Sequence, residues 1–422
     1  MGSESGMERS GSQPPRGDIS DLLGKKVVIL TFGCTYNHGD TRNLEGVLAR
    51  QGCTITGSVA DADAVIVNTC TVVGPTERKM LRVLRECRDM PLYVTGCMPP
   101  VQREEILTVC DPVFLSPRDI TDTWRKGATF IPHETGIVQL SRGCPGACTY
   151  CITRVARGPL VSYPEEEILH CIRNQAGSGS IEIRLTAQDC SAWGKDRGSS
   201  LPALLERIGS LPGKFRIRVG MMNPATILPI LDTLPDSFRY QNIFRFAHIP
   251  VQSGSDRILR SMGRGYTRDD VIEIVRVFRN SLPGITIATD VIAGFPGEDN
   301  DDLAATCDLL DAIMPAKVNI TRYSRRPHTP AAEMKDHPGR VKKKRSRLLQ
   351  RHAEALYRNL NKALVGRDAA VMVTERIKPG TVLARTDSYT GIVLRQDLPV
   401  GTELKVRPVE DRTYFFIGEI VR

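Results

Sequence analysis

The sequence contains neither a long apolar run nor an apolar leader. No stretch of the 422 residues approaches the roughly 20 consecutive apolar residues that a membrane-spanning helix needs. Residues 1–15 are rich in glycine, serine, glutamate and proline and include no apolar segment of the secretory type. We therefore expect a cytoplasmic protein without a membrane anchor, in which residues 1–24 form a flexible N-terminus.

The composition is that of a globular protein with more than one domain. Hydrophobic residues make up 41% of the chain and charged residues 25%, which are ordinary values for a globular chain. The length suits two or three domains. In a reducing cytoplasm, the twelve cysteines are expected to be metal ligands or buried thiols, because disulfides are rare there.

Positive charge is concentrated in one segment. Between Lys335 and Lys362 there are ten lysines or arginines against two carboxylates, Asp336 and Glu354, so this segment carries +8 of the formal net charge of +9. Such a concentration favours a polyanionic partner, with nucleic acid preferred over a membrane surface. The alternative is an ordinary solvated helix face.

The hydrophobic pattern divides the chain into three parts. Residues 25–133 alternate short apolar runs with helical patterns, which predicts an N-terminal α/β domain with a parallel sheet. Residues 363–422 show β-branched runs separated by turn signals, which predicts a small all-β barrel.

The middle part, residues 134–362, repeats the strand and helix alternation at longer spacing. Six such units predict a partial (βα)6 barrel with its active site at the C-terminal ends of the strands. A helix that buries Leu348, Leu349, His352, Leu356 and Leu360 is expected to close it. The six candidate strands are residues 137–140, 181–185, 215–219, 244–251, 285–292 and 318–323.

The sharpest local signal is a C-x3-C-x2-C loop formed by Cys144, Cys148 and Cys151 directly after the first barrel strand. Three thiolates on one short loop can ligate three irons of a [4Fe-4S] cluster and leave the fourth iron open. The alternative is a zinc loop. Structural zinc needs four ligands, and the nearest histidines, His133 and His170, lie outside the loop.

Three further cysteines occupy equivalent places in the N-terminal part. Cys34, Cys70 and Cys97 each follow a candidate strand. Residues just past the ends of parallel strands gather along one edge of a sheet, so these thiols are expected to converge into a second site. The alternative is that each is a small buried hydrophobic residue. We interpret the remaining cysteines as packing residues: Cys53, Cys87, Cys110, Cys171, Cys190 and Cys307.

With these residues in view, the chain resembles the methylthiotransferase family of radical S-adenosylmethionine (SAM) enzymes, in its archaeal and eukaryotic threonylcarbamoyladenosine tRNA branch. The resemblance covers nearly everything from Lys25 to Arg422. Besides the cysteine motifs, it rests on the segments 153–158, 185–189, 222–224, 248–255, 289–298 and 323–327. It implies a radical SAM barrel in the middle of the chain and a TRAM-like RNA-binding domain at its C-terminal end.

The resemblance also implies the chemistry. The cluster on Cys144, Cys148 and Cys151 would bind SAM at its open iron, and an electron passing through it would yield a radical that removes hydrogen from the base. A second [4Fe-4S] cluster on Cys34, Cys70 and Cys97 would carry the sulfur to be inserted. A second SAM would supply the methyl group, which gives 2-methylthio-N6-threonylcarbamoyladenosine at position 37 of tRNA.

Polar residues near the ends of the candidate strands are expected to contact SAM. The resemblance places Gln188, Gln252 and Ser253 near its methionine or ribose part, Asp290 near the ribose hydroxyls and Tyr150 near the adenine. Without the family pattern, Asp290 and Gln252 are equally well interpreted as internal hydrogen-bonded residues and Tyr150 as a packing residue.

The expected partners are the tRNA anticodon stem-loop, a reducing electron donor of the flavodoxin or ferredoxin type, and a sulfur source. The run Lys342, Lys343, Lys344 and Arg345 is expected to bind RNA phosphates together with the C-terminal barrel.

Three alternative functions stay open. Two lie within the family: thiomethylation of isopentenyladenosine in tRNA or of an aspartate on a ribosomal protein. The third is a non-enzymatic RNA-binding protein with a structural metal, which would leave the open iron of the loop unexplained.

Overall fold

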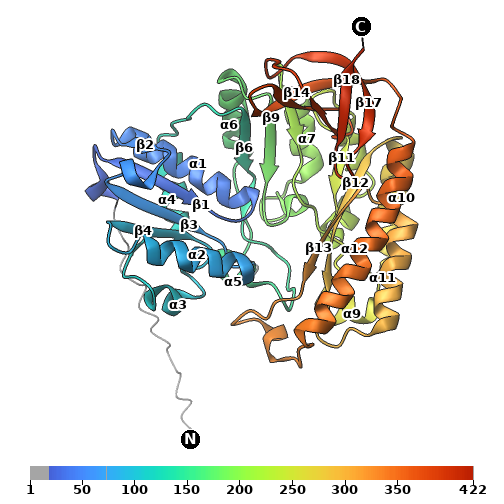
Figure 1. Ribbon diagram of the computed structural model, residues 1–422, viewed down its shortest axis with the longest axis horizontal. Coiled ribbons are helices and arrows are strands. Elements are labelled where there is room, and N and C mark those ends of the chain that lie inside the picture. Colours follow the sequence, from blue (N-terminus) through green and yellow to red (C-terminus); the bar gives the residue numbers. More distant parts are fainter. Residues whose placement is uncertain (1–18, 73, 422) are drawn as a thin grey trace, which may run out of the picture.

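The computed structural model describes residues 19–72 and 74–421 (Figure 1). Most of the expected flexible N-terminus, residues 1–24, lies outside the described residues. Within the remainder, Ser20–Leu22 form one 3-10 turn, and Leu22 is fully buried beside Val27 and Leu48. None of the helices in the described ranges combines the length and apolarity needed to cross a membrane.

The N-terminal part is a parallel five-stranded sheet in the order β2-β1-β3-β4-β5, as the sequence pattern predicts. Every residue of β3 and β4 is buried, because helices cover both faces of the sheet. The helices α1 and α4 pack on one face and α2 and α3 on the other. The bounds are β1 Lys26–Thr31, α1 Thr35–Arg50, β2 Thr54–Thr56, β3 Ala64–Thr69, α2 Gly74–Glu86, β4 Leu92–Gly96, α3 Arg103–Leu107, β5 Val113–Phe114 and α4 Pro117–Arg125.

The middle part contains the six predicted parallel strands in the order β6-β9-β10-β11-β12-β13. The sheets β6-β9-β10 and β11-β12-β13 are linked by parallel bridges, one between Ile217 and Ile243 and one between Met221 and His248. The result is an open barrel, as expected. The strand bounds are β6 Thr135–Gln139, β9 Glu182–Thr186, β10 Arg216–Arg218, β11 Phe246–His248, β12 Thr286–Ala293 and β13 Lys317–Arg322.

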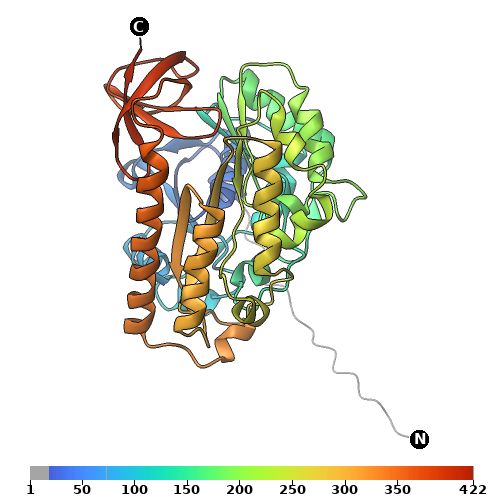
Figure 2. The ribbon, with the colours of Figure 1, turned by 90° about the vertical axis from the view of Figure 1, so that its right-hand side faces the viewer.

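Helices cover the outside of this barrel (Figure 2). The largest apolar core of the molecule lies between strands and helices, with Trp193 and Phe278 as fully buried members. The helix bounds are α6 Glu165–Gly177, α7 Leu201–Gly209, α8 Pro224–Ile227, α9 Asp256–Ser261, α10 Arg268–Ser281, α11 Asn300–Ile313 and α12 Gly339–Lys362.

Two predictions about these elements need correction. The expected strand 244–251 is regular only over Phe246–His248, because Pro250 has no amide hydrogen and Gln252 adopts a positive φ of 65°. On α12 the buried stripe consists of Arg345, Leu349, Ala353 and Tyr357, whereas Leu348 is 40% exposed. The helix turns this face inward because carboxylates inside attract its cations and the Tyr357 hydroxyl accepts a hydrogen bond from the Val318 amide (2.5 Å).

The C-terminal part is a closed five-stranded barrel, as predicted, in the order β14-β15-β16-β18-β17. All neighbours are antiparallel except β16 and β18. Alternate side chains such as Val371, Val373 and Val406 form its core. The bounds are β14 Ala369–Lys378, β15 Thr381–Arg385, β16 Gly391–Leu394, β17 Glu403–Asp411 and β18 Phe416–Ile420.

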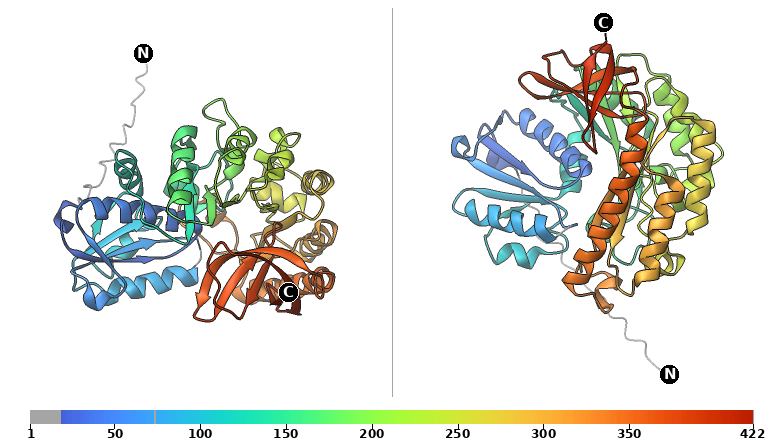
Figure 3. Two further views of the ribbon diagram at one scale, coloured as in Figure 1. Left: turned by 90° about the horizontal axis from the view of Figure 1, so that it is seen from above. Right: turned by 45° about the vertical axis from the view of Figure 1, so that its right-hand side comes forward.

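The C-terminal barrel sits on the N-terminal ends of the central strands (Figures 1 and 3). The Tyr389 ring packs 4.9 Å from the rings of Phe244 and Phe246, and its hydroxyl donates to Glu182 (2.5 Å). Arg385 also binds Glu182 (3.2 Å). The C-terminal barrel therefore lies at the opposite end of the strands from the cysteine loop, and α12 spans the length between them.

Candidate active site

The cysteine loop follows β6 and is closed at its base by a short antiparallel ribbon. This ribbon pairs β7 (Ser141–Arg142) with β8 (Val161–Ser162), and α5 (Ile152–Arg157) follows the loop. Gly143 has φ of 72°, and a Cβ there would lie 1.9 Å from the Pro159 carbonyl oxygen. Only glycine fits this crossing of two backbones.

The loop folds around its own thiols, which we call the barrel trio: Cys144, Cys148 and Cys151. The Gly146 amide donates to the Cys144 sulfur (3.3 Å). A Cβ on Gly146 would lie 3.3 Å from that sulfur and 3.8 Å from the Cys148 sulfur, so the glycine keeps the space between the two open. Burial, together with the nearby Asp189 charge, raises the pKa of Cys144 to about 12.

A buried arginine lies next to the barrel trio. Arg264 donates to the Cys148 sulfur (3.1 Å), to Asn223 Oδ1 (2.9 Å) and to the Pro250 carbonyl oxygen (3.2 Å). The backbone N–H of Asn223 in turn donates to the Asp189 carboxylate (3.1 Å). The guanidinium therefore contacts a thiol of the barrel trio directly and is tied through Asn223 to Asp189.

The other three cysteines lie at the C-terminal ends of three adjacent parallel strands, and we call them the sheet trio: Cys34, Cys70 and Cys97. They follow β1, β3 and β4. Burial raises the pKa of Cys97 to about 12. Arg157 opposes this rise and the nearby Cys34 and Cys70 thiols add to it, so the three thiols lie within electrostatic range of each other. Parallel strands in sequence thus bring distant cysteines to one edge of the sheet.

Asn37 ties these strand ends together. Its amide donates to the carbonyl oxygens of Phe32 (2.9 Å) and Thr69 (2.7 Å), and its Oδ1 accepts from the Cys97 thiol (3.5 Å). Gly33, with φ of 108°, leaves no room for a side chain, because a Cβ there would lie 3.0 Å from the Cys70 sulfur. The backbone at Gly33 therefore lies closer to the Cys70 thiol than any residue with a side chain would permit.

Both trios fit the donor set of an iron-sulfur cluster that has one open iron. Within residues 19–72 and 74–421, no group of three or more histidine, cysteine or acidic side chains is placed to hold one metal ion. In a four-iron cluster each of three thiolates would bind a separate iron. Glycines beside the sulfurs of both trios leave the space that a cluster needs.

Arg157 connects the two halves of the site. It ends α5, directly after the barrel trio, and its Nε lies 3.2 Å from the Cys97 sulfur of the sheet trio. Its Nη2 bonds Asn37 Oδ1 (2.9 Å) and the Asp40 carboxylate (2.6 Å). Burial opposes its charge, but Asp40 and Cys97 outweigh that effect and hold the pKa of Arg157 well above its usual value.

Three of the residues expected to contact SAM lie along the barrel strands. Gln188, after β9, is half-buried, and its buried Oε1 has no hydrogen-bond partner among the described residues. Gln252, after β11, has a strained positive φ that is held by backbone bonds to Asp290 and Ile292. Burial opposes the charge of Asp290 in β12, but the His248 contact (2.9 Å) outweighs it and lowers its pKa.

Of the other two residues, Tyr150 is half-buried and Ser253 is buried. The Tyr150 ring packs edge-on to Phe295 (6.2 Å) beside the apolar cluster that contains Tyr323. The Ser253 hydroxyl accepts from the Ser255 amide (3.2 Å) and lies 3.5 Å from the Thr306 hydroxyl.

The four residues expected to bind RNA point in two directions. Lys342 forms an ion pair with Asp336 (2.8 Å), and Arg345 forms one with Glu298 (3.2 Å), so both face inward. Lys343 and Lys344 are exposed.

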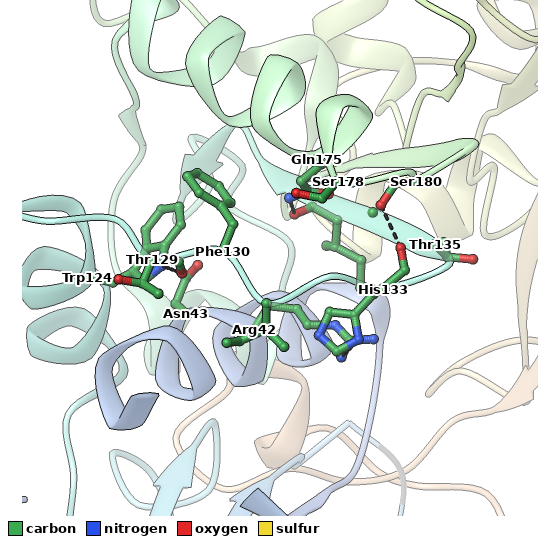
Figure 4. A pocket seen from close by; sticks show the side chains of 13 residues that line it. Arg42, Asn43, Trp124, Thr129, Phe130, His133, Thr135, Gln175, Ser178 and Ser180 are labelled. Carbon is green, nitrogen blue, oxygen red and sulfur yellow. Dashed lines mark hydrogen bonds between the residues drawn. The ribbon is translucent and has the colours of Figure 1, made fainter. Parts of the chain in front are cut away.

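A small pocket lies at the other end of β6 (Figure 4). Arg42 of α1, Trp124 of α4 and Gln175 of α6 line it together with Phe130 and His133. Because it borders the start of β6 and the barrel trio follows the end of that strand, the pocket is separate from both trios.

The sequence pattern did not single out Arg157, Asp40 and Arg264 as site residues. Arg157 and Asp40 stand within the motifs that carry the family resemblance, but they are 117 positions apart. Nothing in local spacing signals that they pair, because the contact depends on how the N-terminal sheet docks against the barrel.

Two family models match the chain: "Radical SAM superfamily" over residues 138–310 and "Uncharacterized protein family UPF0004" over residues 26–114. Among solved structures, the radical SAM methyltransferase TsrM from Kitasatospora setae aligns with a TM-score of 0.51 at 14% identity, covering 73% of this chain and 75% of that one. This likeness supports the fold.

Full-length relatives are more informative. A probable threonylcarbamoyladenosine tRNA methylthiotransferase from Archaeoglobus fulgidus is 37% identical, covering 94% of this chain and 98% of its own. One from Methanothermobacter thermautotrophicus is 36% identical over 92% and 98%. The human threonylcarbamoyladenosine tRNA methylthiotransferase is 32% identical over 98% and 77%. This chain therefore belongs to the threonylcarbamoyladenosine tRNA methylthiotransferase family of radical SAM enzymes.

Proposed function

We propose that this protein converts N6-threonylcarbamoyladenosine at position 37 of tRNA to its 2-methylthio derivative. The observation that carries the proposal is the presence of two separate cysteine trios, linked by one buried arginine, Arg157. The barrel trio is proposed to hold the cluster that binds SAM, and the sheet trio the cluster that carries sulfur. When bound, these groups supply the reducing electron and the sulfur, and SAM supplies the radical and the methyl group.

The protein's own side chains bind and orient the reactants. The Oε1 of Gln188 is buried without a hydrogen-bond partner among the described residues, so it would accept a hydrogen bond from the amino group of SAM. Asp290, ionised by its contacts with His248 and Asn319, is suited to accept bonds from ribose hydroxyls. Gln252 and Ser253 complete this set on the loop after β11, and Tyr150 closes it beside the barrel trio.

The outward face of α12 is proposed to bind the anticodon stem-loop. Arg345, Leu349 and Ala353 mark the buried side of the helix. At 100° per residue, a set of cations lies on the opposite side. All are exposed, and none forms an ion pair within the described ranges: Arg340, Lys343, Lys344, Arg347, Arg351, Arg358 and Lys362.

The helix α12, which carries this cationic stripe, links the end of β12 to the C-terminal barrel. Lys342, in its first turn, lies against Gly294 at the end of β12, and Asn361, in its last turn, binds Asp411 (2.8 Å) of the C-terminal barrel. The 24 residues of α12 span about 36 Å. Like charges spaced three or four residues apart weaken a helix, and a bound phosphate backbone removes this repulsion.

The reaction needs further partners. A reductant of the flavodoxin or ferredoxin type and a source of sulfur are proposed, and the free state of all cysteines in the described residues suits a cytoplasmic location.

Product analysis tests the proposed function. Reconstituted enzyme, reductant and SAM are incubated with tRNA that carries threonylcarbamoyladenosine. The tRNA is then digested, and its nucleosides are separated by chromatography and identified by mass spectrometry. We expect 2-methylthio-N6-threonylcarbamoyladenosine. Product on tRNA with isopentenyladenosine, or on the ribosomal-protein aspartate, but none on this tRNA would contradict the proposal. No SAM cleavage on any substrate would favour a non-enzymatic RNA-binding protein.

Neutralising part of the cationic stripe is expected to weaken tRNA binding. Exchange of Lys344, Arg347 and Arg351 for glutamine should lower affinity by about tenfold or more at 0.1 M salt and reduce the slope of log affinity against log salt by about 2–3. Fluorescence anisotropy over a salt series measures both. The matched control exchanges Arg82, Arg85 and Arg88, exposed cations of the N-terminal part. An equal loss in the control would show that only net charge matters.

A further inference from the structure

The inner face of the central barrel carries cations at its centre. On β9 and β10, Ile183, Leu185 and Ile217 belong to the core between strands and helices. Because side chains alternate along a strand, Arg184 and Arg218 point to the other side, into the barrel. On β13, the buried Val318 likewise places Lys317 on the inner side.

These three cations differ in how they are compensated. Arg184 is paired with Glu182 (2.6 Å). Arg218 forms no hydrogen bond or ion pair with any residue of the described chain, and its guanidinium instead lies 5.0 Å from the ring centre of Phe246. The Lys317 amine also has no hydrogen-bond partner among the described residues. Arg218 and Lys317 therefore retain unused donors.

Two carboxylates, Glu182 and Asp290, lie near these cations, but among the described residues neither forms an ion pair with Arg218 or Lys317. Glu182 is already shared by Arg184, Arg385 and the Tyr389 hydroxyl. Asp290, opposite Asn319 in the strand register, accepts from His248 (2.9 Å) and Asn319 (2.7 Å).

The charge of Arg218 also acts on Lys317 through space. Burial, and then the charge of Arg218, lowers the pKa of Lys317, and burial lowers the pKa of Arg218. Lys317 is exposed, but Arg218 is half-buried. A half-buried cation without a paired anion is costly, and a bound anion removes that cost.

The modified base brings a suitable anion. A threonylcarbamoyl group ends in a free carboxylate, whereas an isopentenyl group is a neutral hydrocarbon. C2 and N6 leave the adenine ring in different directions, so a base with C2 toward the cysteine trios extends its N6 substituent away from them. The inner face of the barrel lies on that side, between the trios and the C-terminal barrel.

We propose that Arg218 and Lys317 bind the carboxylate of the N6-threonylcarbamoyl group and thereby select this base over isopentenyladenosine. This inference rests on the proposed function. A guanidinium binds a carboxylate with two parallel hydrogen bonds, and the ammonium adds a point charge. SAM carries a carboxylate too, so the test must separate the two sources.

The first test needs no variant. Wild-type holoenzyme is given anticodon stem-loops that carry either the threonylcarbamoyl free acid or its methyl ester, which lacks the negative charge and adds one methyl group. We expect kcat/KM for methylthiolation to be about 10–100-fold higher for the acid. Equal rates would overturn the inference while leaving the proposed function intact, whereas absence of product on either stem-loop would overturn the function itself.

The second test uses the double variant R218Q/K317Q. We expect its preference for the acid to fall to about unity, while the dissociation constant for SAM, measured by equilibrium dialysis, stays within about twofold. Exposed cations nearby give the control, K214Q/R245Q, which should keep the preference. A variant that retains the preference, or that loses SAM binding instead, would assign these cations to another role.

Discussion

Replacing Arg157 with leucine is expected to lower the free energy of unfolding by about 3–5 kcal/mol, the usual cost of removing one partner from a buried ion pair. The arginine side chain is 5% exposed and that of Asp40 is 4% exposed. Without the guanidinium, the Asp40 carboxylate stays buried without its cation, and Asn37 and Cys97 each lose a donor. Urea unfolding of the cluster-free protein, followed by circular dichroism, measures the change.

Two variants separate this effect from a general loss of helix stability. Arg154 lies on the same short helix but is exposed, so Arg154→Leu should change stability by less than about 0.5 kcal/mol. Adding Asp40→Leu to Arg157→Leu should restore part of the loss, because the unpaired charge is then removed. An Arg157→Leu protein as stable as the wild type would show that this contact does not hold the N-terminal sheet against the barrel.

The second large effect is expected for the sheet trio. The variant with Cys34, Cys70 and Cys97 changed to alanine should lose about half of its iron and all methylthio product, yet still cleave SAM to 5′-deoxyadenosine. The reason is that the barrel trio, on its own loop after β6, keeps all three of its ligands. Anaerobic iron and sulfide quantification, with chromatography of both products, measures these outcomes.

The reciprocal variant and a matched control sharpen this prediction. Alanine at Cys144, Cys148 and Cys151 should abolish SAM cleavage as well as product. Three other cysteines of the N-terminal part serve as the control: Cys53, Cys87 and Cys110. Changing them to alanine should leave the iron content unchanged, because none of them lies just past the C-terminal end of a strand. If the sheet-trio variant kept all of its iron, a second cluster on these residues would be ruled out.

The resemblance and the hydrophobic pattern were sufficient for the architecture. All six barrel strands were predicted within a few residues, because each places apolar residues between turn signals. For α12 the pattern was right for Leu349, which is buried, and for Leu356, which packs against the core, but wrong for Leu348. Apolar spacing selected Leu348, but the ion pairs of Lys342 and Arg345 with Asp336 and Glu298 turn the helix, and those carboxylates come from other parts of the chain.

The sequence by itself determined the family and the two sets of cysteines, because motif spacing and position after a strand are local properties. Only the tertiary structure decided that Arg157 reaches Cys97 and Asp40, that Arg218 and Lys317 share the inner face of the barrel, and that the cations of α12 other than Lys342 and Arg345 face outward. These facts depend on contacts between residues far apart in the chain. Docking of the sheet against the barrel and the rotation of each helix set such contacts, and no local pattern encodes them.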